Sequence, residues 1–335
     1  MPRARGSFLQ QLAPGISVTD LRARHPIIAA VRLARFLRRC RPNALIASQA
    51  VGINTAVATR ALAVADVPVI GVQHNVLSEL CRQSKSLQMR RVMPLLARMF
   101  YPLADRIVAV SQGVAADLEK VTGVPEDEIA VIPSTTLTPE IPALAQQPTG
   151  WPWLDSKNGP VVLAVGNLRP VKDHAMLIRA FARLRAVRSA KLVILGEGEE
   201  RPKLEQLTRQ LGIEQDMLMP GHDPNPYAAM ARADVLALSS RHEGFGNVLV
   251  EAIACGCPVI ATDCPHGPAE ILQGGRYGRS VPAGDDVAMA GALMAALDER
   301  IIPREALRQR AAQFSVDRMV DRYLHLFACV PEGRR

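Results

Sequence analysis

The stretch Ser240–Thr262, "SRHEGFGNVLVEAIACGCPVIAT", holds a glycine-rich turn, a short helix and a buried strand in immediate succession. The glycines on either side of Phe245 permit turn conformations that other residues adopt only at a cost. From Val248 the apolar residues recur at helical spacing, and Gly256 suits the position just after a helix. The apolar run Pro258–Ala261 then predicts a buried strand. This succession predicts a parallel α/β domain.

Two carboxylates belong to the same stretch. Glu243 precedes the glycine turn, and Glu251 follows eight residues later within the predicted helix. The backbone amides at the start of that helix favour an anion, because they have no partners inside the helix. We therefore predict a site for an anion that carries hydroxyl groups.

Apolar strands alternate with helical segments along the whole chain. The predicted strands are 44–47, 69–72, 106–110, 130–132, 161–165, 192–195, 217–219, 235–238, 259–261 and 280–281. A proline-rich interval, "PSTTLTPEIPALAQQPTGWPW", separates the two halves and is typical of a linker. The alternation predicts two doubly wound domains, with a cleft at the carboxyl ends of their strands. We place these domains at residues 1–147 and 148–315.

Two further glycine loops follow strands of the second half. In "VVLAVGNLRPVKDH", Gly166 is followed by the cations Arg169 and Lys172, which suits a phosphate. In "KLVILGEGEER", Gly196 and Gly198 form the second loop. Neither loop has the spacing of a nucleotide P-loop or a dinucleotide fingerprint, and each alone is typical of an ordinary strand–helix turn.

Positive charge is concentrated near the start of the chain. Residues 1–106 contain 16 Lys and Arg against four Asp and Glu, so they carry +12 although the whole chain carries +8. The segments "HPIIAAVRLARFLRRCRP" and "QMRRVMPLLARMFYPLAD" both predict basic amphipathic helices. Such helices are either ordinary surface helices or a surface that attracts anionic lipid or nucleic acid. We favour lipid, because aromatic residues make up only 4% and no nucleic-acid motif occurs.

The composition predicts a globular cytoplasmic protein that can associate peripherally with the inner face of a membrane. The chain has 335 residues, 48% of them hydrophobic, and no apolar run long enough to span a bilayer. Met1–Gln11 lacks the apolar centre of a signal peptide. Six cysteines without paired C-x-x-C units favour a reducing compartment over a zinc site.

The motif E-G-F-G-x-x-x-x-E, from Glu243 to Glu251, resembles that of the retaining glycosyltransferases of family 4. The blocks "GNLRPVKDHAMLIRAF", "LVILGEGEER" and "RIVAVSQGVAADL" are similar to that family as well, and the resemblance runs from about Pro42 to Phe327. It implies the GT-B fold, in which two Rossmann-like domains face a cleft. It also implies that a helix at 316–330 crosses back to the first domain.

The resemblance implies a UDP-sugar or GDP-sugar donor and a glycan or lipid-linked acceptor, with no metal, no other cofactor and no nucleic acid. Catalytic roles are implied for His74, Glu243 and Lys172. The donor-binding positions implied are Gly166, Asn167, Arg169, Lys172, Gly196, Gly244, Phe245, Gly246, Asn247 and Glu251. Lys172 would contact the diphosphate, Glu243 the sugar hydroxyls and Glu251 the ribose. No residue is assigned as a nucleophile, since retention in this family is usually argued as attack from the same face.

The chain departs from the family pattern in two ways. Asn167 stands where family members commonly have Arg, and the opening strand with its glycine-rich acceptor loop is absent. We therefore expect an incomplete and smaller first domain, an irregular segment up to about Thr19, and an open sheet edge. The alternative function is a truncated or degenerate homologue that binds nucleotide-sugar or a partner subunit without transfer. A GT-B-shaped epimerase is disfavoured by the Glu243 to Glu251 motif.

Overall fold

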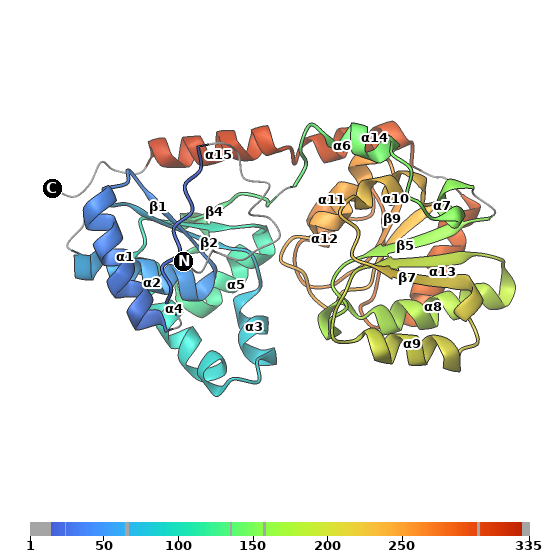
Figure 1. Cartoon of the computed structure of the whole chain (residues 1–335), viewed down its shortest axis with the longest axis horizontal. Coiled ribbons are helices and arrows are strands. Elements are labelled where there is room, and N and C mark those ends of the chain that lie inside the picture. Colours follow the sequence, from blue (N-terminus) through green and yellow to red (C-terminus); the bar gives the residue numbers. More distant parts are fainter. Residues whose placement is uncertain are drawn as a thin grey trace.

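The computed structural model describes residues 15–23, 25–63, 67–134, 136–156, 159–299 and 302–329. They form two domains, each built on a parallel sheet (Figure 1). The first sheet has the order β1-β2-β3-β4, with strands Leu45–Ser48, Val69–Gln73, Arg106–Ala109 and Ile129–Val131. The second has the order β10-β9-β8-β5-β6-β7. Its strands, β5 to β10, are Val161–Val165, Lys191–Leu195, Met217–Gly221, Val235–Leu238, Val259–Thr262 and Arg279–Val281. All ten predicted strands are confirmed, with ends moved by two residues at most.

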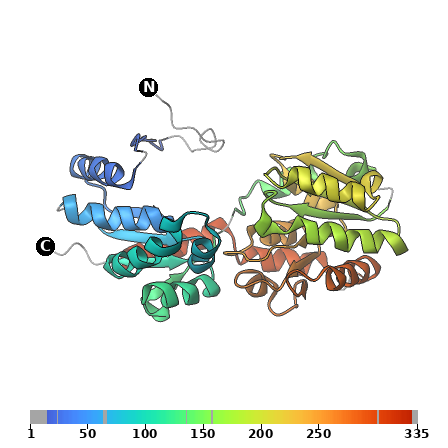
Figure 2. The same cartoon turned by 90° about the horizontal axis from the view of Figure 1, so that it is seen from below.

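One face of the first sheet is covered by the helices that follow β1, β2 and β3, and a further helix precedes β1. Its helices are α1 Pro26–Cys40, α2 Gln49–Ala63, α3 Leu77–Gln83, α4 Met93–Phe100 and α5 Gln112–Thr122, with a π-helical turn at Gln88–Val92. Buried residues such as Ile53, Tyr101 and Val114 fill this side of the sheet. The turned view shows α1 beside α2 at the outer edge of the domain (Figure 2). Both predicted basic segments are therefore helical.

The other face of the first sheet is covered by the C-terminal helix α15, Val316–Ala328. Met319, Tyr323 and Phe327 pack on the buried side chains of Ile70 and Val108. Arg106 also donates a hydrogen bond to the carbonyl of Cys329 at 2.6 Å. The predicted return of this helix to the first domain is thus observed, and its apolar side explains why the sheet face is dry.

The proline-rich interval is more ordered than a linker. It contains α6, Ile141–Gln146, and α7, Pro152–Asp155, each with a proline in its first turn, where proline fits a helix. Asn225 and Arg232 donate to the carbonyls of Leu144 and Ala145 at 3.0 and 3.1 Å, which attaches α6 to α10. The predicted linker does connect the two sheets, and it contains two short helices because the prolines stand in their first turns instead of interrupting them.

The second domain is covered on both faces. Its helices are α8 His174–Val187, α9 Arg201–Gln210, α10 Pro226–Arg232, α11 Asn247–Ala254, α12 Pro268–Leu272, α13 Asp286–Asp298 and α14 Arg304–Ala312. Helices α10, α11 and α14 share one core with β5, β8 and β9, whereas α8 and α13 lie in the core of the opposite face. The predicted turn–helix–strand unit at 243–262 is confirmed by α11 and β9.

The first sheet ends at an open edge. Within the described residues it has four strands against six in the second sheet, and β1 pairs only with β2. Ile46 on this strand is 51% exposed. Gly15–Thr19 have no helix or strand, whereas Met1–Pro14 lie outside the described residues, so the prediction for the start is tested only in part. None of the described helices combines the length and apolarity needed to cross a bilayer.

Candidate functional site

A cavity of about 420 Å³ lies between the two domains, at the carboxyl ends of their strands. The residues that line it are His74, Asn75, Val110, Ser134, Val165, Gly166, Asn167, Lys172, Glu243, Gly244, Phe245, Gly246, Asn247, Val248 and Glu251. Ten of the twelve predicted site residues are in this set. Parallel strands place all their following loops at one edge, which is why residues far apart in sequence meet here.

Lys172 and Glu243 form an ion pair in the wall of the cavity. The Lys172 Nζ to Glu243 Oε1 distance is 2.5 Å, and the two side chains are 22% and 12% exposed. The Ser240 hydroxyl donates to the same carboxylate oxygen at 2.6 Å, and the Ser239 hydroxyl donates to the Lys172 carbonyl at 2.7 Å. Two neighbouring serines after β8 therefore hold both charged residues in place. Sequence reasoning did not include these serines.

The start of helix α11 opens into the cavity without a side-chain cap. Gly246 precedes it with a φ of 99°, a left-handed conformation that favours glycine. The first amides of a helix have no partner within it, and here no capping side chain accepts from them. The buried Oδ1 of Asn247 also has no hydrogen-bond partner. This end of the cavity is therefore suited to an anion with polar groups attached.

Glu251 lies one turn further along α11. Its carboxylate accepts a hydrogen bond from the hydroxyl of Thr136, a residue of the segment between the two domains. Burial raises the pKa of Glu251, and the bond from Thr136 opposes this in part. Burial and the charge of Glu251 raise the pKa of Tyr227 to about 12, so this phenol stays protonated. A desolvated carboxylate in a cavity is a strong acceptor for ligand hydroxyls.

His74 reaches the cavity from the first domain, directly after β2. Burial lowers its pKa below the ordinary value, so the imidazole is neutral at neutral pH. The preceding Gln73 is fully buried; it accepts from the Tyr101 hydroxyl at 2.9 Å and donates to the Asn75 carbonyl at 2.9 Å. This buried pair fixes the turn that carries His74.

The two domains touch across the cavity through backbone and polar groups. A Cβ atom added to Gly244 would lie 1.9 Å from the carbonyl oxygen of His74. The Ser111 hydroxyl donates to the Gly244 carbonyl at 2.6 Å, and the Gly113 amide donates to Glu270 Oε1 at 3.2 Å. The contact of Ser111 with the second domain was not predicted from the sequence. A serine at this position is already accounted for by its role as the N-cap of α5.

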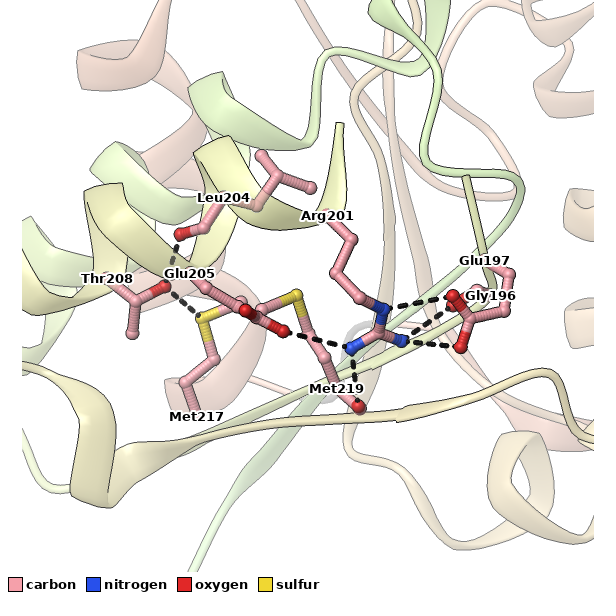
Figure 3. Close-up of polar contacts among 8 residues, drawn as sticks. All are labelled: Gly196, Glu197, Arg201, Leu204, Glu205, Thr208, Met217 and Met219. Atoms are coloured by element: carbon pink, nitrogen blue, oxygen red, sulfur yellow. Dashed lines mark hydrogen bonds and ion pairs between the residues drawn. The ribbon is translucent and has the colours of Figure 1, made fainter. Parts of the chain in front are cut away.

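Arg169 and Gly196 do not line the cavity. Arg169 is exposed. A Cβ on Gly196 would lie 2.0 Å from the Gly166 carbonyl oxygen, so this glycine lets the loop after β6 pack on the loop after β5. Figure 3 shows how the loop after β6 is held: the Arg201 guanidinium contacts Glu197, Glu205 and the carbonyls of Gly196 and Met219. Gly196 therefore supports the cavity wall from behind.

Comparison with known proteins finds relatives over both domains. The family model for glycosyl transferases group 1 matches residues 151–314, and that for glycosyltransferase family 4 matches residues 6–135. An N-acetylgalactosaminyltransferase of Campylobacter jejuni, acting on a diphospho-undecaprenol substrate by its name, is 34% identical over 216 residues, 64% of this chain and 57% of that protein. The lipopolysaccharide core biosynthesis glycosyltransferase LpsE of Rhizobium meliloti is 33% identical over 242 residues, 69% of this chain and 66% of that protein. The matches thus span less than two thirds of these relatives' own lengths.

Solved structures share the arrangement of both domains. HepE of Anabaena, solved in complex with UDP and glucose, superposes with a TM-score of 0.74 at 22% identity over 90% of this chain and 81% of that chain. The lipopolysaccharide outer core galactosyltransferase WaaB gives a TM-score of 0.69 at 20% identity, over 90% of this chain and 80% of that chain. The paired family models and the common two-domain fold show that this chain belongs to glycosyltransferase family 4 and has the GT-B fold.

Proposed function

We propose that the chain transfers a sugar from a nucleoside-diphosphate sugar to a lipid-linked or envelope glycan, with retention of the anomeric configuration. The observation that carries this is the meeting of Lys172, Glu243, Glu251 and the uncapped start of α11 in one cavity. A cation, the amides at a helix start that no side chain caps, and two carboxylates match the diphosphate and the hydroxyls of such a donor.

Each group has a place in donor binding. The diphosphate accepts hydrogen bonds from Lys172 and from the first amides of α11, while the ribose hydroxyls donate to Glu251. Glu243 accepts from the hydroxyls of the transferred sugar. Before donor binding, Lys172 is paired with Glu243 at 2.5 Å, which holds it at the edge of the phosphate position.

The same groups serve bond cleavage. Breaking the anomeric C–O bond leaves positive charge on the sugar and negative charge on the departing phosphate. Lys172 and the α11 amides stabilise the phosphate charge as it grows. The neutral His74 hydrogen-bonds the donor sugar from the opposite domain. The acceptor hydroxyl attacks from the face that the phosphate leaves, and the phosphate takes its proton.

The acceptor class rests on the relatives. The names of two relatives refer to an undecaprenol-linked substrate and to lipopolysaccharide core biosynthesis. A lipid-linked acceptor would be met at a membrane surface, and the first domain has a surface suited to contact with a membrane.

That surface is formed by α1 and by the segment from Leu87 to Leu103, both of which contact α2. Its exposed apolar side chains are Ile27, Ile28, Val31, Leu87, Val92, Leu95, Met99 and Leu103. Its exposed arginines include Arg35, Arg39, Arg90, Arg91 and Arg98. Apolar side chains interleaved with arginines are typical of helices that lie in a bilayer interface. We therefore propose peripheral association with the anionic inner face of the cell membrane.

Titration calorimetry with UDP, GDP and their common sugar conjugates tests the donor site. We expect one nucleotide class to bind, and Lys172→Ala and Glu251→Ala each to weaken it about tenfold or more, the loss expected for a hydrogen bond to a charged group. Arg209→Ala is the matched control, because Arg209 is exposed on α9 and lies outside the cavity wall. Unchanged affinity in both variants, with the fold intact, would contradict the assignment.

The open edge of β1 favours one alternative, a homologue that binds donor but does not transfer sugar. Incubating the chain with its donor and membrane lipids that carry glycan acceptors separates the two. Transfer with the α-configuration of an α-linked donor retained, read by NMR of the product, supports the enzyme. Donor binding without any transfer supports the alternative.

A further inference from the structure

The segment that joins the domains reaches into the donor cavity. It runs from the end of β4 at Val131 to the start of α6 at Ile141. Ser134 lines the cavity, and the hydroxyl of Thr136 donates to Oε1 of Glu251. Next to Thr136, the Leu137 carbonyl accepts from the Val316 amide at 3.4 Å, at the second crossing between the domains. The backbone next to Thr136 is therefore attached to this second crossing.

Thr136 contacts the carboxylate of Glu251, whose oxygens must accept both from Thr136 and from the ribose hydroxyls. Two ribose hydroxyls need two acceptor positions, and a carboxylate offers about four lone-pair sites on its two oxygens. The Thr136 bond takes one site on Oε1 and leaves Oε2 without a hydrogen-bond partner among the described residues. A free glutamate rotates about three side-chain bonds, so one fixed oxygen limits where the other can point.

We infer that Thr136 is a positioning residue for nucleotide recognition: its hydroxyl fixes the Glu251 carboxylate in the orientation that receives the ribose hydroxyls. This inference rests on the proposed function, because it needs a ribose at Glu251. It assigns part of the nucleotide site to the segment between β4 and α6, which connects the two sheets. Glu251 alone would still bind ribose, but in a less favourable orientation.

Thr136→Val tests the inference, because valine keeps the shape and removes the hydroxyl. The probes are the nucleoside diphosphate that the wild type prefers and its 2′,3′-dideoxy analogue, measured by calorimetry. We expect the variant to bind the ribose form about three- to tenfold more weakly, the size of a lost hydrogen bond to a charged group near solvent. Affinity for the dideoxy form should be unchanged, and Thr136→Ser should restore the wild-type value.

Thr138→Val is the matched control, since Thr138 is an exposed threonine of the same segment outside the cavity wall. A second readout is the pH dependence of ribose-form binding. The titratable side chains that interact with Glu251 are Tyr227 on α10, which Thr136 also hydrogen-bonds, and Cys255 on α11, and burial raises the pKa of both. Both stay protonated below pH 8, and the diphosphate titrates alike in the ribose and dideoxy forms. The affinity difference between the two forms on acidification therefore reports Glu251, and its loss should begin at a higher pH in Thr136→Val, because the Thr136 bond lowers the pKa of Glu251.

Two outcomes would overturn the inference. Equal weakening of the ribose and dideoxy forms would show a general structural role for Thr136, and equal affinity of variant and wild type would show no role. A wild type that binds no nucleoside diphosphate would instead contradict the proposed function, and the inference would fall with it. Weaker binding in Glu251→Ala beside an unchanged Thr136→Val would keep the function and reject only Thr136.

Discussion

Gly244→Ala should disable transfer by separating the two domains at the cavity. Among the described residues, Gly244 is not one of the glycines with a positive φ, so alanine suits its backbone. The requirement for glycine comes from the other domain, because the added Cβ would lie 1.9 Å from the His74 carbonyl oxygen. Backbone stands on both sides of this contact, and no side chain can rotate away.

The size of the effect follows from the contact. Cβ atoms essentially never come within 3.0 Å of other heavy atoms, so the domains must move apart by at least about 1 Å. The 2.6 Å bond from Ser111 to the Gly244 carbonyl is then lost as well. A displacement of about 1 Å in an active site can cost about 100-fold in rate, which corresponds to about 2.7 kcal/mol. We expect kcat/KM for transfer to fall by about that factor.

Steady-state transfer assays measure this, with circular dichroism to show that both domains remain folded. Gly291→Ala is the matched control, because Gly291 lies in α13 with no atom within 4 Å of an added Cβ. It should keep full activity and stabilise the protein by about 0.5–1 kcal/mol. A Gly244→Ala variant within threefold of wild-type activity would refute the reasoning that the domains act in this closed contact.

Three further predictions follow from burial and charge. Burial raises the pKa of Glu251, so its ionised form destabilises the fold, and the free energy of unfolding rises as the pH falls through that pKa. Glu251→Gln should therefore raise the free energy of unfolding at pH 7 by about 0.5–2 kcal/mol, measured by urea titration. It should also make that free energy depend less on pH in the acid range. Leu326→Ala removes a buried contact of α15 with the first sheet and should cost about 2–3 kcal/mol by the same measurement, whereas the exposed Leu324→Ala should cost little. Replacing Arg90, Arg91 and Arg98 by Gln should weaken sedimentation with phosphatidylglycerol vesicles about 100-fold, at about 1 kcal/mol for each arginine, without changing binding to phosphatidylcholine; equal binding to both kinds of vesicle would reject an anionic docking surface.

The strands could be predicted because each is a short apolar run bounded by glycine, proline or polar residues. Val161–Val165 and Val235–Leu238 are buried along nearly their whole length, so their composition alone identifies them. The packing of α15 on the first sheet could not be derived in this way. Its apolar spacing predicts a helix with one buried side, but the partner surface around Ile70 lies about 250 residues earlier in the chain.

The placement of site residues could be predicted where one sequence motif contains several of them, and less well where they come from distant parts of the chain. Glu243 and Glu251 share one turn–helix unit, so their placement follows from local structure. The pairing of Glu243 with Lys172 joins residues 71 positions apart, and sequence patterns do not reveal it. The packing of Gly196 on the loop after β5 could not be predicted, because a glycine that touches phosphate and a glycine that lets two loops pack together look the same in sequence.

A crystal structure of the chain with its nucleoside diphosphate bound tests the central claim most directly. We predict the diphosphate against Lys172 and the first amides of α11, with both ribose hydroxyls on the Glu251 carboxylate. A nucleotide bound in another cavity, or bound here with its base toward Lys172 and its phosphates toward Glu251, would contradict the account.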